Sequence, residues 1–554
     1  MTNKTLADKV QADSFDYVIV GAGSAGCVLA NRLTADSRHR VLLIEAGGHD
    51  RHFWIHVPLG YGKLFNDARV NWLYSSEPEP ELDNRRIIQP RGKVLGGSSS
   101  INGLLYIRGQ HEDFDRWRQL GNAGWSFDDV LPYFRRAEDQ ERGADALHGT
   151  GGPLSVSNVC EPHPLCEAFI AAVQQAGHPR NDDFNGATQE GAGYFQYTAR
   201  NGLRRSTAAG YLRQARRRGN LNVVTNALAT RILLDGRRAT GIEYRRDGAT
   251  HVARANVEVI LAGGAFNSPQ LMQLSGLGPA ALLQQHGIAV VADIPGVGAD
   301  LQDHLQVRFQ YRCTEPITMN DVVHNWRHKM LAGLRYFATR KGMLAIGAGY
   351  AGAFLRTRPH LATPDVQLHF LIFSADTAGA TLHTFPGFIV SVCQLRPESR
   401  GYVRIKSADP AEPPAIQPRY LTSQFDRDTL LAGMRQLQGI MRQPAMRRYV
   451  AAEHKPAPGV TSDADLMAYA RATSTTVFHP TSTCRMGSDP AAVVDERLRV
   501  RGIERLRVVD ASIMPALVSG NTNAATVMIG EKGADMILED AAAAATASPA
   551  LAPA

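Results

Sequence analysis

The chain has 554 residues, 44% of them hydrophobic and 20% charged, with a net charge of +7 at neutral pH. A chain of this length exceeds one hydrophobic core, which predicts a globular protein of at least two domains. The mild, dispersed positive charge argues against nucleic-acid binding, and the six cysteines do not form a disulfide framework.

The sequence predicts neither a signal peptide nor a membrane-spanning segment. Residues 1–14 lack the apolar core of a signal peptide, and no run of about 20 apolar residues could span a bilayer. The sequence therefore predicts a cytoplasmic protein, with peripheral attachment to the inner membrane left open. The basic run at 200–220 predicts the solvated face of a helix, with an anionic membrane surface as its alternative partner. The alanine-rich residues 541–554 are predicted to be disordered.

The first folded unit is a nucleotide-binding pattern. "FDYVIV" (15–20) reads as a buried parallel strand, and glycines follow it in the order G-x-G-x-x-G before a helical repeat. A second apolar run, "RVLLIEAGG", ends near Glu45, whose carboxylate could accept hydrogen bonds from ribose hydroxyls. Strand, glycines, helix, strand and acid in this order predict a dinucleotide site, and the residues concerned are Gly21, Gly23, Ser24, Ala25, Gly26, Glu45 and Ala46.

A second glycine-rich segment, "PRGKVLGGSSSINGLLYIRG" (90–109), is too apolar for a linker. Gly96 and Gly97 would let its backbone approach a polar cofactor closely. By contrast, "CEPHPLC" (160–166) places a histidine between two thiols, but no second ligand pair follows at zinc spacing, so no metal site is predicted.

Two mid-chain runs read as strands. In "DVQLHFLIF" (365–373) the alternating positions are apolar on both faces, and "FIVSVCQL" (388–395) is similar. The surrounding segments hold small and apolar side chains, and the one acid among them is Asp376. This composition would suit a pocket for the apolar tail of a substrate.

Near the C-terminus, "TTVFHPTSTCRMG" (475–487) places His479 on a segment with neither helical nor strand periodicity. From this segment alone the residue could be a hydrogen-bonded loop histidine or a proton-transfer group.

Several long motifs resemble those of the glucose–methanol–choline (GMC) oxidoreductases, which are flavoenzymes that oxidise alcohols. The nearest resemblance is to bacterial choline-dehydrogenase-like and FAD-dependent alcohol dehydrogenases. The motifs include "NWLYSSEPEPELDNRR", "GGAFNSPQLMQLSGLGP" (263–279), "LRPESRGYVRIKSADPAEPPAIQPRYL" (395–421) and "RVVDASIMPALVSGNTNAATVMIGEKGADMI" (507–537), and the similarity runs along nearly the whole chain.

The resemblance implies an α/β (α+β, two-domain) fold. A Rossmann-like FAD-binding domain would be assembled from residues 14–158, 200–310 and 465–540, the last part carrying the catalytic pair. A discontinuous substrate domain on a large antiparallel sheet would comprise 159–199 and 311–464. Further FAD contacts are implied for Val94, Gly97, Ser98, Asn102, Gly103, Leu104, Ala229, Asp510, Ala511 and Thr522. Some family members bond the flavin covalently through a histidine where Ile101 stands, so the FAD here is expected to be non-covalent.

The resemblance also gives His479 a role, because the family's catalytic histidine lies in this motif and Asn521 occupies the place of its partner. It implies oxidation of a primary alcohol to the aldehyde, with proton abstraction at His479 and hydride transfer to flavin N5. Electrons would pass to a quinone or a protein acceptor. An oxygen-using alcohol oxidase and a choline dehydrogenase are the alternatives.

An uncharged alcohol is favoured over choline, since Phe478 is the one aromatic face that can be placed for a cation. His304 is expected to be structural.

Overall fold

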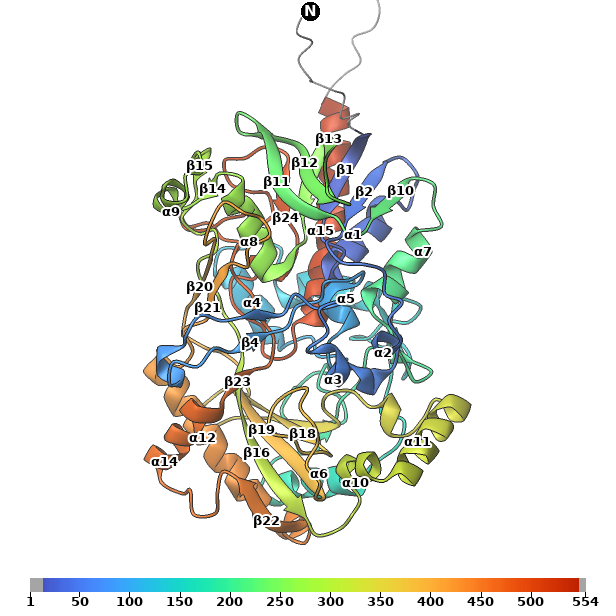
Figure 1. Ribbon diagram of the computed structural model, residues 1–554, viewed down its shortest axis with the longest axis vertical. Coiled ribbons are helices and arrows are strands. Elements are labelled where there is room, and N and C mark those ends of the chain that lie inside the picture. Colours follow the sequence, from blue (N-terminus) through green and yellow to red (C-terminus); the bar gives the residue numbers. More distant parts are fainter. Residues whose placement is uncertain (1–12, 548–554) are drawn as a thin grey trace, which may run out of the picture.

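The computed structural model describes residues 13–547, and its two large sheets lie one above the other in Figure 1. The upper sheet has the strand order β10-β2-β1-β13-β12-β11, with β24 also paired to β13. Its parallel strands are β1 (Asp13–Val20), β2 (Val41–Ile44), β10 (Leu221–Val224), β13 (Ala249–Leu261) and β24 (Leu506–Val508), and β11 (Leu228–Asp235) and β12 (Arg238–Arg246) extend it as an antiparallel hairpin.

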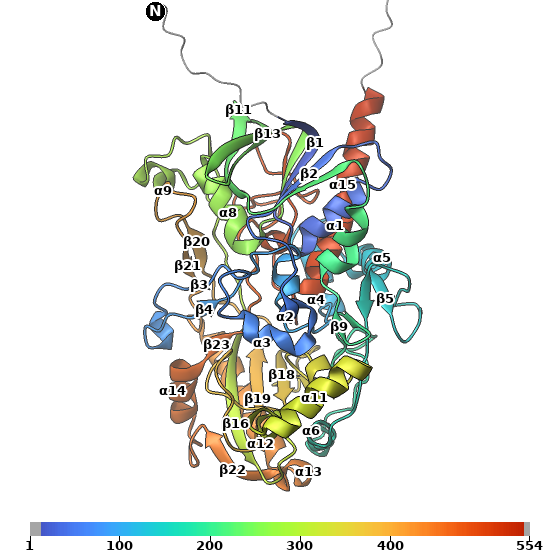
Figure 2. The ribbon, with the colours of Figure 1, turned by 45° about the vertical axis from the view of Figure 1, so that its right-hand side comes forward.

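Helix α1 (Ser24–Leu33) leaves β1 through the glycine turn and packs against α15 (Asn523–Ala547), as Figure 2 shows. A Cβ atom at Gly530 would lie 3.0 Å from the Val28 side chain, so the two helices are in close contact. The prediction that disorder begins at residue 541 is wrong for 541–547, because α15 continues to Ala547. Alanine has the highest helix propensity, which explains this extension. Residues 1–12 and 548–554 lie outside the described part of the chain.

The lower sheet has the order β22-β16-β19-β18-β17-β7, with β23 paired to β16, and its pairs are antiparallel. The strands are β7 (Gly191–Tyr194), β16 (Leu305–Cys313), β17 (Ala351–Leu355), β18 (Val366–Leu371), β19 (Gly387–Gln394), β22 (Val450–Lys455) and β23 (Thr475–Thr476).

One face of the lower sheet is a hydrophobic core under α6 (Pro164–Gln175) and α12 (Gln424–Met441). Phe309, Phe370 and Val390 belong to this core, whereas Arg308, His369 and Ser391 alternate with them and point to the opposite face. The prediction that β18 is apolar on both faces is therefore wrong, because His369 lies on the second face.

The remaining helices connect and cover these sheets. They are α2 (Phe53–His56), α3 (Tyr61–Leu64), α4 (His111–Gln119), α5 (Phe127–Ala137), α7 (Arg213–Ala215), α8 (Gly264–Leu274), α9 (Ala280–Gln285), α10 (Met319–His324), α11 (Trp326–Thr339), α13 (Pro444–Arg447) and α14 (Asp463–Thr473). Short strand pairs are β3 (Tyr74–Ser75) with β4 (Ile88–Gln89), β5 (Glu138–Gln140) with β6 (Leu154–Val156), β8 (Ala199–Arg200) with β9 (Leu203–Arg204), β14 (Leu277–Gly278) with β15 (Ala292–Asp293), and β20 (Tyr402–Arg404) with β21 (Ala415–Gln417).

The chain crosses between the sheets several times, and the predicted α/β fold class is confirmed by the two sheets. The predicted boundary at residue 310 differs from the structure, because β16 starts at Leu305 and pairs along its length with the lower sheet. Between residues 13 and 547, no helix is both long and apolar enough to cross a membrane.

Candidate active site

A cavity of about 580 Å³ is lined by residues of both sheets. Most of the residues singled out in the sequence line it, although they come from all parts of the chain. They are Gly21, Gly23, Ser24, Ala25, Glu45, Ala46, Gly97, Ser98, Asn102, Gly103, Leu104, Ala229, Phe478, His479, Asp510, Ala511, Asn521 and Thr522.

The two glycine-rich segments meet at the upper wall of this cavity. Gly97 has a φ of +52°, and a Cβ atom there would lie 2.6 Å from the Gly23 Cα. Gly26 is outside the lining, because it is the point at which α1 presses on the strand turn: its Cβ atom would lie 1.9 Å from the Gly21 carbonyl oxygen. Val94 does not line the cavity either, since it is fully buried in a cluster with Ile55 and Leu64.

Polar groups at this wall are held by the backbone. The Glu45 carboxylate accepts hydrogen bonds from the Ala22 and Gly47 amides, at 2.9 and 2.8 Å, and burial raises its pKa to about 7. The Asp510 carboxylate accepts from the Gly264 amide at 2.8 Å and from the Ser268 hydroxyl at 2.6 Å. Glycine turns, a helix N-terminus and fixed carboxylates are the groups that a dinucleotide cofactor requires.

Only part of the basic run at 200–220 forms the solvated helix face that we expected: Arg213 on α7 and Arg216 just beyond it are exposed, whereas Arg204 is buried. Arg204 is 3% exposed, and its Nη1 donates to the Asn102 side-chain oxygen at 2.7 Å and to the Ser99 carbonyl at 3.2 Å. Burial lowers the pKa of Arg204 to about 9. This arginine therefore helps to hold the second glycine-rich segment in place through hydrogen bonds.

His479 stands at the centre of a hydrogen-bond chain. Its Nδ1 lies 3.0 Å from Nδ1 of His304, whose Nε2 lies 2.8 Å from the Leu395 carbonyl oxygen, and its Nε2 lies 3.1 Å from the Asn521 side-chain nitrogen. A carbonyl oxygen can only accept, so His304 carries its proton on Nε2 and offers the Nδ1 lone pair. His479 then donates from Nδ1, which leaves the lone pair of its Nε2 beside Asn521.

Electrostatics favour the neutral forms of both rings. Burial lowers the pKa of His304 to about 4, and its side chain is inaccessible to solvent. Burial also lowers the pKa of His479 well below the usual range, and His304, His369 and Arg91 contribute to this shift. The unprotonated Nε2 of His479 is thus the form expected at neutral pH.

Asp303 fixes the backbone that carries the histidine. Its Oδ1 accepts from the His479 amide at 2.8 Å, and its Oδ2 accepts from the hydroxyls of Thr476 at 2.6 Å and Tyr420 at 2.5 Å. The preceding Phe478 has a φ of +70°, a region that non-glycine residues seldom occupy. This network holds a strained turn in place and aims the imidazole into the cavity.

Sequence reasoning missed several residues here. His304, expected to be structural, touches His479 directly, and Arg308, His369 and Ser391 also line the cavity. The alternation of polar and apolar residues in "LQVRFQYR" was the available signal, because it places Arg308 on the face opposite the core.

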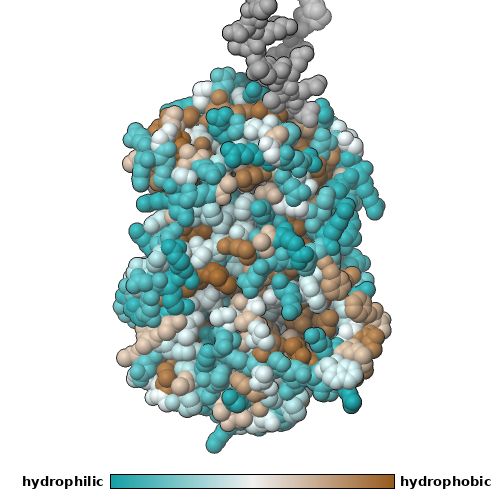
Figure 3. Space-filling view, viewed as in Figure 1, coloured by the Kyte–Doolittle hydropathy of each residue, from teal (hydrophilic) through white to brown (hydrophobic). Residues whose placement is uncertain are grey.

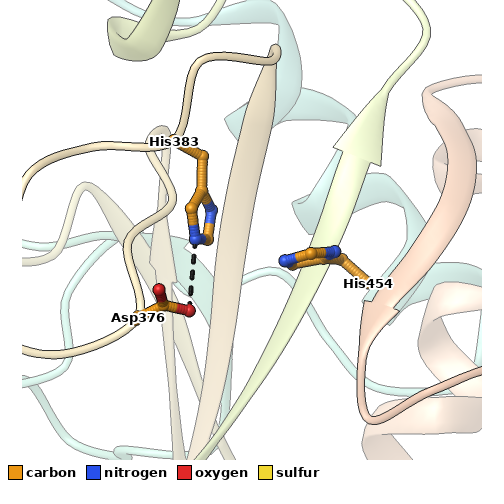
Figure 4. Close-up of side chains that lie close together, drawn as sticks. All are labelled: Asp376, His383 and His454. Atoms are coloured by element: carbon orange, nitrogen blue, oxygen red, sulfur yellow. Dashed lines mark hydrogen bonds and ion pairs between the residues drawn. The ribbon is translucent and has the colours of Figure 1, made fainter.

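Asp376 lies in a charged cluster beside the cavity (Figure 4). One ligand-type atom each of Asp376, His383 and His454 lies within 4.8 Å of the others, an arrangement that the sequence spacing did not predict. The Lys455 ammonium group is 2.6 Å from the Asp376 carboxylate and already supplies a positive charge there. Because residues 377–382 line the cavity, this cluster holds both ends of a lining segment in place.

Comparison with known proteins identifies the family. Two GMC oxidoreductase family models match residues 15–306 and 397–530. The chain is 44% identical to the oxygen-dependent choline dehydrogenase of Photobacterium profundum, covering 95% of this chain and 93% of that protein. It is 43% identical to the alcohol dehydrogenase [acceptor] of Pseudomonas putida, covering 95% and 96% of the two chains.

Among solved structures, pyridoxine 4-oxidase from Mesorbium loti superimposes with a TM-score of 0.87 at 30% identity, over 95% of this chain and 99% of that one. Structural neighbours in this family include FAD-dependent oxidoreductases. The two glycine segments and the fixed carboxylates at the upper wall fit FAD, and the predicted family and cofactor are confirmed. The chain belongs to the GMC oxidoreductase family, FAD-dependent enzymes that act on CH–OH groups.

Proposed function

We propose that this protein oxidises a primary alcohol to the aldehyde, with His479 as the base, and passes the electrons to a quinone or another non-oxygen acceptor. The observation that carries the proposal is the hydrogen-bond chain from Leu395 through His304 to His479, which leaves Nε2 of His479 unprotonated beside Asn521, at the wall of the cavity.

The residues would divide the work as follows. The alcohol oxygen would lie within hydrogen-bond reach of both the Nε2 of His479 and the Asn521 amide nitrogen, and it would replace their direct 3.1 Å contact. As the hydroxyl proton moves to Nε2, the carbon becomes able to release a hydride, and bound FAD supplies the hydride acceptor. The imidazolium so formed keeps its Nδ1 hydrogen bond to His304, which prevents the ring from turning during the transfer.

The FAD would be held without a covalent bond. Gly21, Gly23, Gly97 and Glu45 would face its nucleotide end, and the position that could bond the ring is Ile101, which is 7% exposed and has no nucleophile. Acid precipitation should release all flavin absorbance into the supernatant. Absorbance that stays with the pellet would contradict this part of the proposal.

The surface of α11 supports an acceptor that reaches the enzyme from a membrane. Trp326, Met330, Leu334 and Phe337 are 69, 50, 60 and 57% exposed and fall on one helical face. Phe337 stacks on the exposed Phe53 at 6.3 Å. In Figure 3, hydrophobic residues gather at the lower right, where Figure 1 places α11.

The positive charges around α11 and the closeness of this helix to the cavity support a bilayer as the partner of its apolar face. Residues 322–364 contain no acid, and this stretch carries Arg327, Lys329, Arg340 and Lys341. Apolar residues flanked by cations are typical of helices that lie in an anionic membrane surface. Val323, on the preceding helix α10, is 37% exposed and also lines the cavity. A lipid-soluble acceptor could therefore pass from the bilayer to the cavity along an apolar path.

The alcohol and acceptor assignment is tested with the purified holoenzyme, a panel of alcohols, and oxygen, a quinone analogue and a dye as acceptors. We expect turnover with the quinone analogue and the dye and little hydrogen peroxide. Peroxide formed at the full dye-coupled rate would identify an oxidase, and a specificity constant highest for choline would identify a choline dehydrogenase.

The membrane face is tested by flotation with anionic vesicles. The variant Trp326→Ser/Leu334→Ser should lose vesicle binding, whereas Leu120→Ser, at a comparably exposed residue away from α11, should keep it. If the double variant instead dissolves a dimer and vesicle binding is absent from the outset, the face binds a second copy of the chain.

A further inference from the structure

Three polar side chains form a row across the cavity face of the lower sheet. Arg308 on β16 pairs in register with Ser391 on β19, which pairs in turn with His369 on β18. All three line the cavity. Their chain neighbours Val307, Phe309 and Phe370 point to the opposite face and lie in the core. Because side chains alternate along a strand, the three polar side chains point toward the cavity.

These side chains lack partners within residues 13–547. Neither ring nitrogen of His369 is hydrogen-bonded, and the Ser391 hydroxyl is buried without a partner. No ion pair or side-chain hydrogen bond is found for the Arg308 guanidinium in the same part of the chain, although burial lowers its pKa. Buried polar groups are normally paired, because leaving them unpaired costs free energy. Two buried groups without partners among the described residues and one partly exposed, unpaired guanidinium in the same row of a cavity indicate a ligand that completes them.

The charges around the row define that ligand. The cavity-lining acids Glu45 and Asp510 are both engaged by groups at the upper wall. Lining residues contributed by the lower sheet include Arg308 and no acid. A cationic substrate such as choline would meet an unpaired guanidinium there, whereas an anionic group would neutralise it. Arginine pairs with carboxylates through two parallel hydrogen bonds, and a serine hydroxyl and a neutral histidine can each donate one more.

The row lies beside the catalytic pair. Gln367, two residues before His369 on β18, has its side-chain nitrogen 3.4 Å from the Asn521 side-chain oxygen. His369 also contributes to the lowered pKa of His479. One small molecule could therefore place a hydroxyl at His479 and an anionic group at Arg308.

We infer that the substrate is an alcohol that carries a carboxylate, bound by the row Arg308–Ser391–His369 while its hydroxyl faces His479 and Asn521. This inference rests on the proposed alcohol oxidation and replaces the uncharged alcohol favoured by the sequence. The physical reason for the change is the unpaired cation, which the composition of the mid-chain segments did not reveal.

The first experiment compares specificity constants of the holoenzyme, with a dye as acceptor, for ω-hydroxy carboxylates, alkanols of equal length and choline. We expect the hydroxy carboxylate to exceed its matched alkanol at least about tenfold, and choline to be the poorest. In Arg308→Gln this preference should fall by roughly 10²-fold, and Arg308→Glu should shift it toward choline. Arg312→Gln, an exposed arginine on the same strand, is the matched control.

A second experiment does not depend on turnover. Binding of an unreactive alkanoate, followed by the flavin difference spectrum, should be tight in the native protein and weakened roughly 10²-fold in Arg308→Gln. Equal constants for hydroxy carboxylates and alkanols, or alkanoate binding unaffected by the substitution, would overturn the inference and leave alcohol oxidation standing. Loss of FAD from the Arg308 variants would also overturn it, by assigning this arginine to the cofactor. Alkanoate binding without oxidation of any alcohol would instead refute the proposed function.

Discussion

The upper and lower walls of the cavity are built in different ways. The upper wall is made of short contiguous motifs, in which glycines and their neighbours act through the backbone. The lower wall and the proposed catalytic centre are made of single side chains from distant strands and loops, such as His304, His369 and His479. Recognition through the backbone requires a contiguous motif that can be recognised in the sequence. A site assembled from separate strands contributes only isolated residues, which form no motif.

The substitution with the largest expected effect is one that disrupts the upper wall of the cavity. In Gly97→Ala, the new Cβ would lie 2.6 Å from the Gly23 Cα, at a φ of +52° that alanine adopts only with strain. We expect the protein to lose most of its FAD, and its activity with it, as measured by flavin absorbance per chain. Gly439→Ala, which meets nothing within 4 Å, should keep both. A Gly97→Ala protein that binds a full complement of FAD and is active would mean that the two glycine segments do not form the cofactor wall.

Removing the proposed base should slow the reaction and leave FAD binding at the upper wall intact. His479→Ala should lose roughly 10²- to 10⁴-fold in kcat while retaining FAD, since we propose that this imidazole accepts the hydroxyl proton. Asn521→Ala should lose less, because an amide can position the oxygen but cannot accept its proton. The exposed His360 offers a control in His360→Ala. A larger loss in Asn521→Ala than in His479→Ala would assign the proton step elsewhere.

These two predictions also separate what the sequence could and could not supply. The glycine turn, the parallel strand at 15–20 and Glu45 were predictable because local geometry requires those residues in that order. His479 and Asn521 came from a family resemblance, since their own segments have no periodicity. The partnership of His304 with His479 depends on strand pairing between β16 and β23, which no local pattern encodes. Arg308 was detectable by strand alternation, but the sequence could not show that its guanidinium has no partner among residues 13–547.

A smaller effect is expected for the positioning histidine. His304→Leu removes the acceptor of the His479 Nδ1 proton, so the ring can turn or change tautomer, and kcat should fall roughly 10- to 100-fold with little change in KM. His304→Gln offers an amide oxygen in the same region and should recover part of the loss. A purely structural role would instead lower thermal stability and leave the pH profile of kcat unchanged.

The pH dependence gives the finest comparison. Only neutral His479 can accept a proton, and burial together with His304, His369 and Arg91 holds its pKa below the usual range. As the pH is lowered, kcat/KM should stay constant through neutrality and fall only when the pH drops below this depressed pKa. A decline that already begins above the ordinary histidine pKa would show that another group is the base.

The most direct test of alcohol oxidation at His479 is anaerobic mixing of the holoenzyme with its alcohol while flavin absorbance is followed, because this step needs no electron acceptor. We expect the alcohol to bleach the flavin in the native protein, a slower bleaching when the carbinol hydrogens are replaced by deuterium, and bleaching roughly 10²- to 10⁴-fold slower in His479→Ala. Flavin that no alcohol reduces, or that His479→Ala reduces at the native rate, would contradict the account.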